Sequence, residues 1–112
     1  MHNDKKRILF ILSKIDDLNS YKNEYGSITK LLESKLGLDA ALMCLMQIGE
    51  NINKLDNQYK DLDENDVKGA YNVRNFIAHD YEGINIAIIE DIIRTYIPKL
   101  EISLKKIIKE LI

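Results

Sequence analysis

The sequence predicts an all-α fold, an up-and-down bundle of four or five helices. Apolar residues recur at helical spacing along most of the chain. Five glycines and a single proline leave few points at which helices must stop. The one short alternation typical of a strand, at residues 84–88, has no second strand with which to pair. A length of 112 residues, of which 46% are apolar, predicts a single domain over residues 1–112.

The N-terminal segment carries an apolar stripe at i, i+3, i+4 and i+7 spacing, with charged residues between its members. This stripe predicts an amphipathic helix over residues 4–25, which Gly26 ends. Ser27 can cap a short second helix, which Gly37 closes. The two apolar faces consist of Ile8, Ile11, Leu12, Ile15 and Leu18, and of Ile28, Leu31 and Leu32.

The third predicted helix, residues 39–59, is apolar on two sides. Met43 and Met46 line the side opposite to its main stripe. A helix that is apolar on opposite sides belongs in the middle of a bundle, where neighbours cover both of them. The main stripe consists of Ala41, Leu45, Ile48, Ile52 and Leu55.

The second half of the chain predicts two further helical segments. A polar stretch at residues 57–66 indicates a loop, and Asp63 or Asn65 can cap a fourth helix over residues 67–78. The last segment extends to the C-terminus, and Pro98 should kink or split it because proline has no amide hydrogen. One face of this last segment carries Ile89, Ile93, Tyr96, Leu100, Leu104, Ile107 and Leu111.

Charge and composition exclude several classes of protein. A net charge of −2 argues against a strongly basic, non-specific nucleic-acid binder, but it permits a local basic cleft. The single cysteine, Cys44, excludes an intrachain disulfide. The longest uncharged apolar run, residues 40–49, is about half as long as a membrane span. Charged residues close the N-terminal apolar run too early for a signal peptide, so we expect a cytoplasmic protein without a membrane partner.

Arg74 stands near the centre of the apolar arc of the predicted fourth helix. A guanidinium on a buried stripe is costly unless it is paired or faces a water-filled cleft. Two structural explanations are open, because the side chain can extend to the rim of the core or pair with Glu50 of the third helix. The functional alternative is that Arg74 faces a water-filled cleft in which it can bind a ligand. The arc itself is formed by Val67, Ala70, Tyr71, Ile77 and Ala78.

His79 follows Arg74 by five residues, which is about 140° around an ideal helix. The two side chains therefore diverge unless the helix frays near His79 or a second subunit brings its own copy alongside. Asn75 lies four residues before His79, on a neighbouring position of the helix surface. A lone histidine at a helix end is most often a cap or a partner of the helix dipole. The segment that follows is polar, so we expect Tyr81 to be exposed.

The octapeptide RNFIAHDY, residues 74–81, resembles the Arg-x-x-x-x-His-x-Tyr motif of the HepT-like branch of the HEPN superfamily. The resemblance extends beyond the motif. AALMCLMQIGENINKL, residues 40–55, is similar to the Ile-Gly-Glu helix of that family, and YIPKL, residues 96–100, to its proline-bearing last helix. Together these segments span about two thirds of the chain in the family's order. The resemblance implies a HEPN-like bundle.

The same resemblance implies a dimeric, metal-independent ribonuclease whose two Arg–His pairs meet in the dimer cleft. Members of this family act as the toxin of a type VII-like toxin–antitoxin pair. Their partner is a nucleotidyltransferase antitoxin of the MNT type, which transfers AMP from ATP to the motif tyrosine. In this sequence that tyrosine is Tyr81.

The implied chemistry suits the residue types. RNA brings its own nucleophile, the 2′-hydroxyl, so a metal-free site needs a group that titrates near neutrality and a fixed positive charge. His79 suits the first role and Arg74 the second, and Asn75 can orient the imidazole or donate to phosphate. The expected products carry 2′,3′-cyclic phosphate and 5′-hydroxyl ends. We expect neither a cofactor nor a metal site, because the other histidine is the N-terminal His2 and no carboxylates stand at ligand spacing beside His79.

Two readings without catalysis compete with this one. The first is a catalytically silent HEPN domain that binds nucleotide or RNA. The second is a helical dimerisation module in which Arg74 is merely paired with Glu50.

Overall fold

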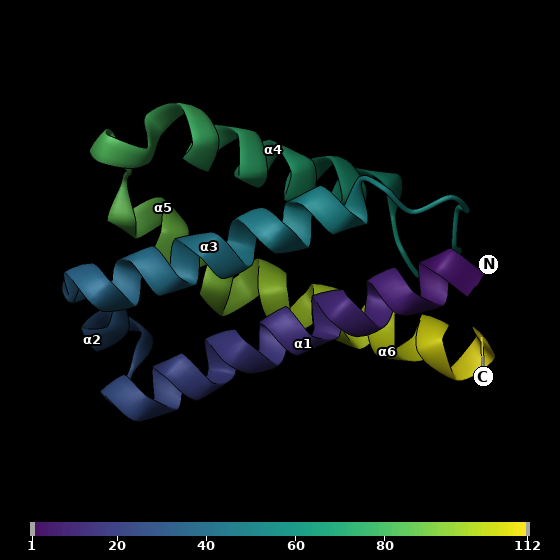
Figure 1. Ribbon diagram of the computed structural model, residues 1–112, viewed down its shortest axis with the longest axis horizontal. Coiled ribbons are helices and arrows are strands. Elements are labelled where there is room, and N and C mark those ends of the chain that lie inside the picture. Colours follow the sequence, from purple (N-terminus) through teal and green to yellow (C-terminus); the bar gives the residue numbers. More distant parts are fainter. Residues whose placement is uncertain (1, 112) are drawn as a thin grey trace.

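The computed structural model describes residues 2–111, and their side chains from residue 3 onward. It is an all-helical bundle, with no strand among these residues, which confirms the predicted fold class (Figure 1). A 3₁₀ turn, Tyr81–Gly83, follows the fourth helix, and a π-helical turn, Ile92–Tyr96, joins the last two helices. The α-helices are α1 (His2–Tyr25), α2 (Ile28–Glu33), α3 (Lys35–Ile52), α4 (Glu64–Asp80), α5 (Ile86–Asp91) and α6 (Ile97–Leu111).

The long helices run alternately up and down the bundle (Figure 1). α3 lies between α1 and α4 and packs against both of them, as predicted for the third helix. α6 covers α1 on its other side, so the first and last helices of the bundle are neighbours. No helix in the described part of the chain has the length and apolar character that a membrane span requires.

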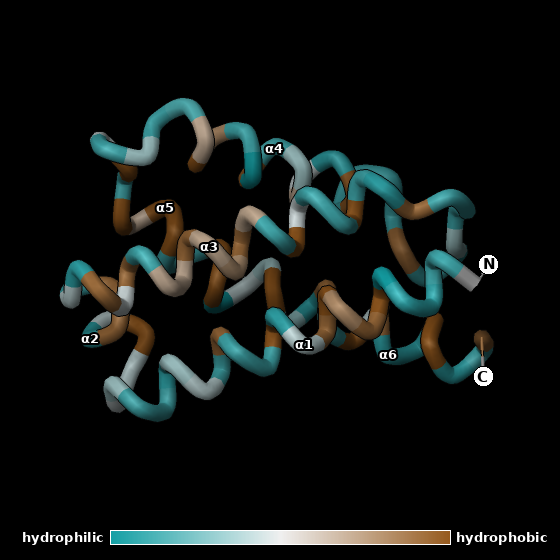
Figure 2. The backbone as a smooth tube through the Cα atoms, viewed as in Figure 1, coloured by the Kyte–Doolittle hydropathy of each residue, from teal (hydrophilic) through white to brown (hydrophobic). Residues whose placement is uncertain are grey.

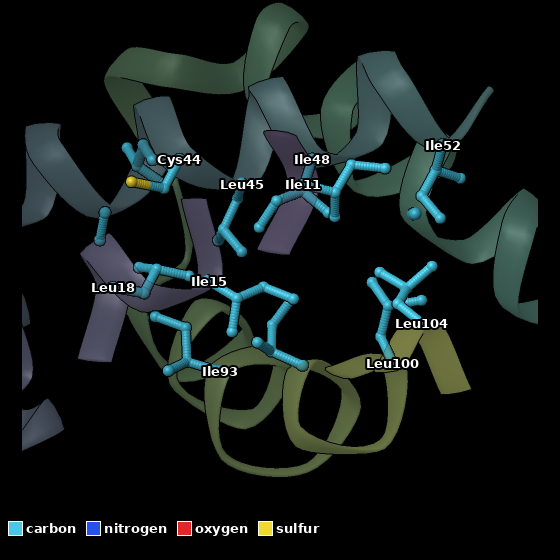
Figure 3. Close-up of a cluster of buried hydrophobic side chains, with 14 of the residues drawn as sticks. Ile11, Ile15, Leu18, Cys44, Leu45, Ile48, Ile52, Ile93, Leu100 and Leu104 are labelled. Atoms are coloured by element: carbon cyan, nitrogen blue, oxygen red, sulfur yellow. The ribbon is translucent and has the colours of Figure 1, made fainter. Parts of the chain in front are cut away.

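The core fills the space enclosed by α1, α3 and the last helical segment. Side chains from all three point toward one another there (Figure 3). α5 is mostly hydrophobic, whereas α4 is largely hydrophilic and contributes only Ala70 and Ile77 as fully buried side chains (Figure 2). Cys44 belongs to this core, and burial raises the pKa of its thiol to about 11. Residues labelled in the close-up include Ile11, Ile15, Leu18, Leu45, Ile48, Ile52, Ile93, Leu100 and Leu104.

The start of the third helix differs from the prediction, since Gly37 does not close α2 but lies within the first turn of α3. Ser34 caps α3, with its hydroxyl accepting from the amide of Gly37 at 3.3 Å. A Cβ at position 37 would come within 2.2 Å of the Leu31 carbonyl oxygen. The glycine is therefore needed for the close approach of α2 to α3.

The predicted burial of Met43 on α3 is also wrong, because Met43 is 56% exposed.

The predicted third helix is also too long at its other end, since α3 ends at Ile52 rather than near residue 59. The chain beyond it turns back over the start of α1, where Asp4 is completely buried. The Asp4 carboxylate accepts from the backbone amides of Asp56 and Asn57, at 2.8 and 3.1 Å. It also accepts from the Tyr59 hydroxyl at 2.7 Å. These contacts favour a loop, because in a longer helix the same amides would instead donate to carbonyl oxygens four residues earlier.

The fourth helix begins at one of its two predicted caps, whereas the cap of the last segment was not predicted. Asp63 caps α4 by accepting from the amide of Asn65 at 2.9 Å, and the helix is longer than the predicted 67–78 at both ends. Asn85 caps α5, so the alternation at residues 84–88 begins a helix. Pro98 is the second residue of α6 and directly follows the π-helical turn. The helical backbone continues through the π-helical turn, so the last segment is not split at Pro98; its irregularity is the π-helical turn that directly precedes the proline.

Candidate functional site

The motif residues occupy the last turns of α4 and the 3₁₀ turn after it. α4 is continuous through Asp80, so the alternative of a helix that frays near His79 is wrong. On a continuous helix, Arg74 and His79 project about 140° apart. Within one chain they therefore face different sides of α4.

The Arg74 guanidinium contacts Glu50 through its buried Nε, and part of the side chain is exposed to solvent. Its Nε lies 2.8 Å from Oε2 of Glu50 on α3. This nitrogen is buried, yet its N–H has no aligned hydrogen-bond acceptor, so the contact is an ion pair of poor geometry. The Arg74 side chain is 32% exposed, and that of Glu50 is 40% exposed. The outer guanidinium nitrogens can therefore meet an anion from solvent.

A close crossing of α3 and α4 places Glu50 opposite Arg74. Gly49 makes this crossing possible, because a Cβ there would lie 2.3 Å from the Ala70 carbonyl oxygen and 2.8 Å from the Arg74 Cβ. No larger residue fits between the two helices without moving them apart. Sequence reasoning assigned no role to Gly49, although a glycine inside an apolar helix is a signal of close backbone approach.

Asn75 is hydrogen-bonded to Arg74 and lies one helical turn before His79. Its side-chain oxygen accepts from Nη1 of Arg74 at 3.0 Å, which leaves its amide N–H groups as donors for other partners. His79 stands one turn further along α4 and is exposed. Asn75 can therefore donate to the imidazole or to a phosphate oxygen while it steadies Arg74.

Tyr81 is held by two charged residues of α3. Its hydroxyl donates to Oδ1 of Asp39 at 2.5 Å and accepts from Nζ of Lys35 at 3.5 Å. Lys35 and Asp39 also form an i,i+4 ion pair with a separation of 2.9 Å. The hydrogen bonds from Tyr81 and then Lys35 lower the pKa of the Asp39 carboxyl, and the bond to Asp39 raises the pKa of Lys35. Tyr81 itself is 43% exposed.

Sequence reasoning missed Lys35 and Asp39. Their i,i+4 spacing predicts an ion pair on one helix, but nothing in the sequence relates them to a tyrosine more than forty residues later. A cavity of about 420 Å³ opens beside this cluster and is lined by all three residues and by apolar side chains of α3 and α5.

Residues that could bind a metal ion are dispersed. Within the described part of the chain, no three histidine, cysteine or carboxylate side chains are grouped as a metal ion would require. The side chain of His2 lies outside the described residues.

An all-helical bundle that presents Arg-x-x-x-x-His-x-Tyr at the end of one helix defines a domain of the HEPN class. A comparison with protein-family models matches residues 11–107 to the family described as "Ribonuclease HepT-like". The chain therefore belongs to the HepT-like ribonuclease family, and the matched region contains the complete motif. Comparisons with curated proteins and with solved structures give no match. Family membership implies an RNA substrate.

Proposed function

We propose that this protein is a metal-independent endoribonuclease in which Arg74 and His79 are the catalytic residues. The observation that carries the proposal is the state of Arg74, which is fixed at its base by Glu50 and exposed at its tip. It lies on the same helix as an exposed histidine, inside the region that matches a ribonuclease family. A charged group that is held in place but incompletely paired is suited to bind a second anion.

The reaction follows from the two groups. The 2′-oxygen of RNA attacks the adjacent phosphorus, the bond to the 5′-oxygen breaks, and His79 exchanges protons with the attacking or the departing oxygen. The Arg74 fork offers charged N–H donors to the phosphoryl oxygens as negative charge develops on them. The products then carry a 2′,3′-cyclic phosphate and a 5′-hydroxyl.

A homodimer can bring Arg74 and His79 together. Because Arg74 and His79 project to different sides of one continuous helix, a two-fold axis beside α4 can bring the arginine of one protomer to the histidine of the other. Such a dimer would contain two equivalent Arg–His sites in one groove. This arrangement also explains why the Arg74 tip is open in the single chain.

We further propose that the protein is the toxin of a type VII-like toxin–antitoxin pair in the cytoplasm. Its antitoxin would be an MNT-type nucleotidyltransferase that transfers AMP to Tyr81. The partly exposed Tyr81 hydroxyl, two residues after His79 and beside a cavity, supports this role. An added AMP would place a bulky anion next to the RNA groove and oppose binding by contact and by charge.

The test is a cleavage assay with the purified protein, labelled RNA and EDTA. We expect cleavage to survive EDTA and to fall at least a hundredfold in Arg74→Ala and in His79→Ala. Arg94→Ala is the matched control, because Arg94 also pairs with a carboxylate, at 2.9 Å from Glu90, but lies outside the motif. Retained cleavage in both motif variants, or its loss in EDTA, would overturn the proposal.

The Arg74–Glu50 ion pair favours one other candidate, a helical dimerisation module or silent HEPN domain in which this pair is only structural. Such a protein would show no cleavage at any concentration. Its expression would not inhibit growth, and His79→Ala would change nothing.

A further inference from the structure

The hydroxyl of Tyr81 lies between two charged groups of a distant part of the chain. Asp39 accepts its hydrogen bond at 2.5 Å, and Nζ of Lys35 lies 3.5 Å from the same oxygen. Lys35 also stands over the tyrosine ring, 5.5 Å from its centroid. The first turns of α3 therefore contact both the hydroxyl and the ring of a residue that follows α4.

We propose that Asp39 is the proton acceptor for nucleotidyl transfer to Tyr81 and that Lys35 contacts the transferred phosphoryl group. This inference rests on the proposed modification of Tyr81. It assigns part of the transfer machinery to the acceptor protein itself, whereas the partner enzyme binds and activates the nucleotide.

The step is a substitution at the α-phosphorus of a nucleoside triphosphate. A bond forms between the Tyr81 oxygen and this phosphorus, and the bond from the phosphorus to the bridging oxygen of pyrophosphate breaks. The phenolic proton passes to the Asp39 carboxylate and from there to solvent. Pyrophosphate leaves with the electron pair of the broken bond.

The position of Asp39 next to the Tyr81 hydroxyl suits it for this transfer, although its carboxylate is not strongly basic. Its bonds to Tyr81 and Lys35 keep the carboxyl ionised, so it is ready to accept a proton at neutral pH. The phenol becomes acidic as its oxygen bonds to phosphorus, and a weakly basic carboxylate then suffices. Protein kinases use an aspartate in the same way to accept the proton of a substrate hydroxyl.

Lys35 supplies the positive charge at this position. A phosphoryl group attached to the Tyr81 oxygen would be adjacent to its ammonium, which already lies within 3.5 Å of that oxygen. The cavity beside the cluster also contains Glu82 in its wall, so Lys35 is needed to offset the repulsion between carboxylates and phosphate.

The cavity gives the nucleotide a route to the hydroxyl. It measures about 420 Å³, and Leu38, Leu42, Ile84 and Ile86 form its apolar wall. Ile86 is 42% exposed, so this wall is accessible to the nucleobase of an incoming nucleotide. An apolar wall next to a few charged groups is typical of small-molecule sites.

A purely structural role for the cluster predicts the opposite result. If Asp39 only ties the turn after α4 to α3, its hydrogen bond blocks the Tyr81 hydroxyl. Removing the carboxylate would then leave modification unchanged or make it faster.

The test is a time course of modification, in which the purified protein, its cognate nucleotidyltransferase and ATP are followed by intact mass spectrometry. We expect Asp39→Asn to slow the addition of AMP about a hundredfold at neutral pH. We expect Asp39→Glu to restore part of the rate and Lys35→Met to reduce it. Glu101→Gln is the matched control, because it breaks another i,i+4 pair, with a separation of 3.1 Å from Lys105, that contacts no tyrosine.

The pH profile separates proton transfer from a structural effect. The deficit of Asp39→Asn should shrink as the pH rises, because hydroxide can then remove the phenolic proton in place of the carboxylate. Circular dichroism checks that each variant is folded. If Asp39→Asn does not fold, Asp39→Ala takes its place, because it also removes the carboxylate.

Three outcomes would overturn the inference. Equal or faster modification of Asp39→Asn, or a deficit that does not change with pH, would overturn it and leave the proposed function intact. A wild-type protein that gains no AMP on the Tyr81 peptide would overturn this inference together with the proposed antitoxin mechanism.

Discussion

Asp4 and Arg74 are two charged side chains that the bundle treats differently. Asp4 is completely buried, and its carboxylate accepts from two backbone amides, an asparagine amide and a tyrosine hydroxyl. The buried Nε of Arg74 approaches a carboxylate without an aligned hydrogen bond, its Nη1 donates to Asn75, and the side chain is 32% exposed. Buried polar groups are normally satisfied, so the exception needs an explanation other than stability.

The electrostatics of Asp4 fit a structural role. Burial raises the pKa of its carboxyl, but hydrogen bonds from Asp56, Tyr59 and Asn57 together outweigh burial and lower the pKa below its ordinary value. Asp4 is thus a stable anion, and these bonds tie the loop after α3 to the start of α1. The contrast with Arg74 agrees with a structural role for this end of the bundle and with the binding role proposed for the motif.

The first prediction tests the structural half of this contrast and has the largest effect on stability. Asp4→Ala should lower the free energy of unfolding by about 3 kcal/mol, because the amides of Asp56 and Asn57 and the hydroxyl of Tyr59 lose their acceptor. Urea unfolding at pH 7 measures the change. Ribonuclease activity of the folded fraction should be retained, since Asp4 is remote from the motif.

Asp16→Ala is the control, because Asp16 is an exposed residue of the same helix and its removal should cost little. The difference between wild type and Asp4→Ala should also shrink in acid. The folded-state pKa of Asp4 is below its ordinary value of 3.8, so the ionised carboxylate stabilises the fold above that pH. This contribution is lost as the pH falls through the folded-state pKa. A difference that stays constant between pH 7 and pH 2 would contradict the role assigned to Asp4.

The second prediction concerns the crossing that positions Arg74. Gly49→Ala should destabilise the protein by about 2 kcal/mol, because the new methyl group would lie 2.3 Å from the Ala70 carbonyl oxygen and must push α3 and α4 apart. The same displacement separates Glu50 from Arg74, so cleavage should fall at temperatures at which the variant is folded. Thermal unfolding and the cleavage assay measure the two effects.

Gly69→Ala is a sharp control on the neighbouring helix. The three atoms nearest to a Cβ there belong to the Tyr96 side chain, at ordinary contact distances of 3.6 to 3.8 Å. Alanine favours helix by up to about 1 kcal/mol over glycine, so this variant should be as stable as wild type or more stable. If both alanine variants behaved alike, the close crossing would not be the reason for Gly49.

Much of the fold was predictable because helical periodicity is local. The stripes of α1 and of the last helix, the caps at Ser27 and Asp63, and the irregular turn before Pro98 all depend on residues close together in the chain. The end of α3 was not predictable in this way, because it depends on Asp4, about fifty residues earlier.

The candidate site was predictable to a similar degree. The motif residues are visible in the sequence, and the ion pair of Arg74 with Glu50 was one of two structural alternatives. The contact of Tyr81 with Asp39 was not predictable, because no spacing rule connects the start of one helix with the turn after another. Long-range contacts between polar side chains leave no periodic pattern.

The third prediction tests the functional half of the contrast and has the smallest effect on stability. A double-mutant cycle of Arg74→Ala and Glu50→Gln should give a coupling free energy below about 1 kcal/mol, because both side chains are about one third exposed and solvent screens the pair. Glu50→Gln alone should nevertheless reduce cleavage about tenfold, because the guanidinium loses the group that fixes its orientation. Lys54→Met is the control, since Lys54 lies 3.9 Å from the other oxygen of Glu50 and contributes nothing to the motif. A large coupling energy without any change in cleavage would instead mean that the ion pair serves stability, and that Arg74 resembles Asp4 after all.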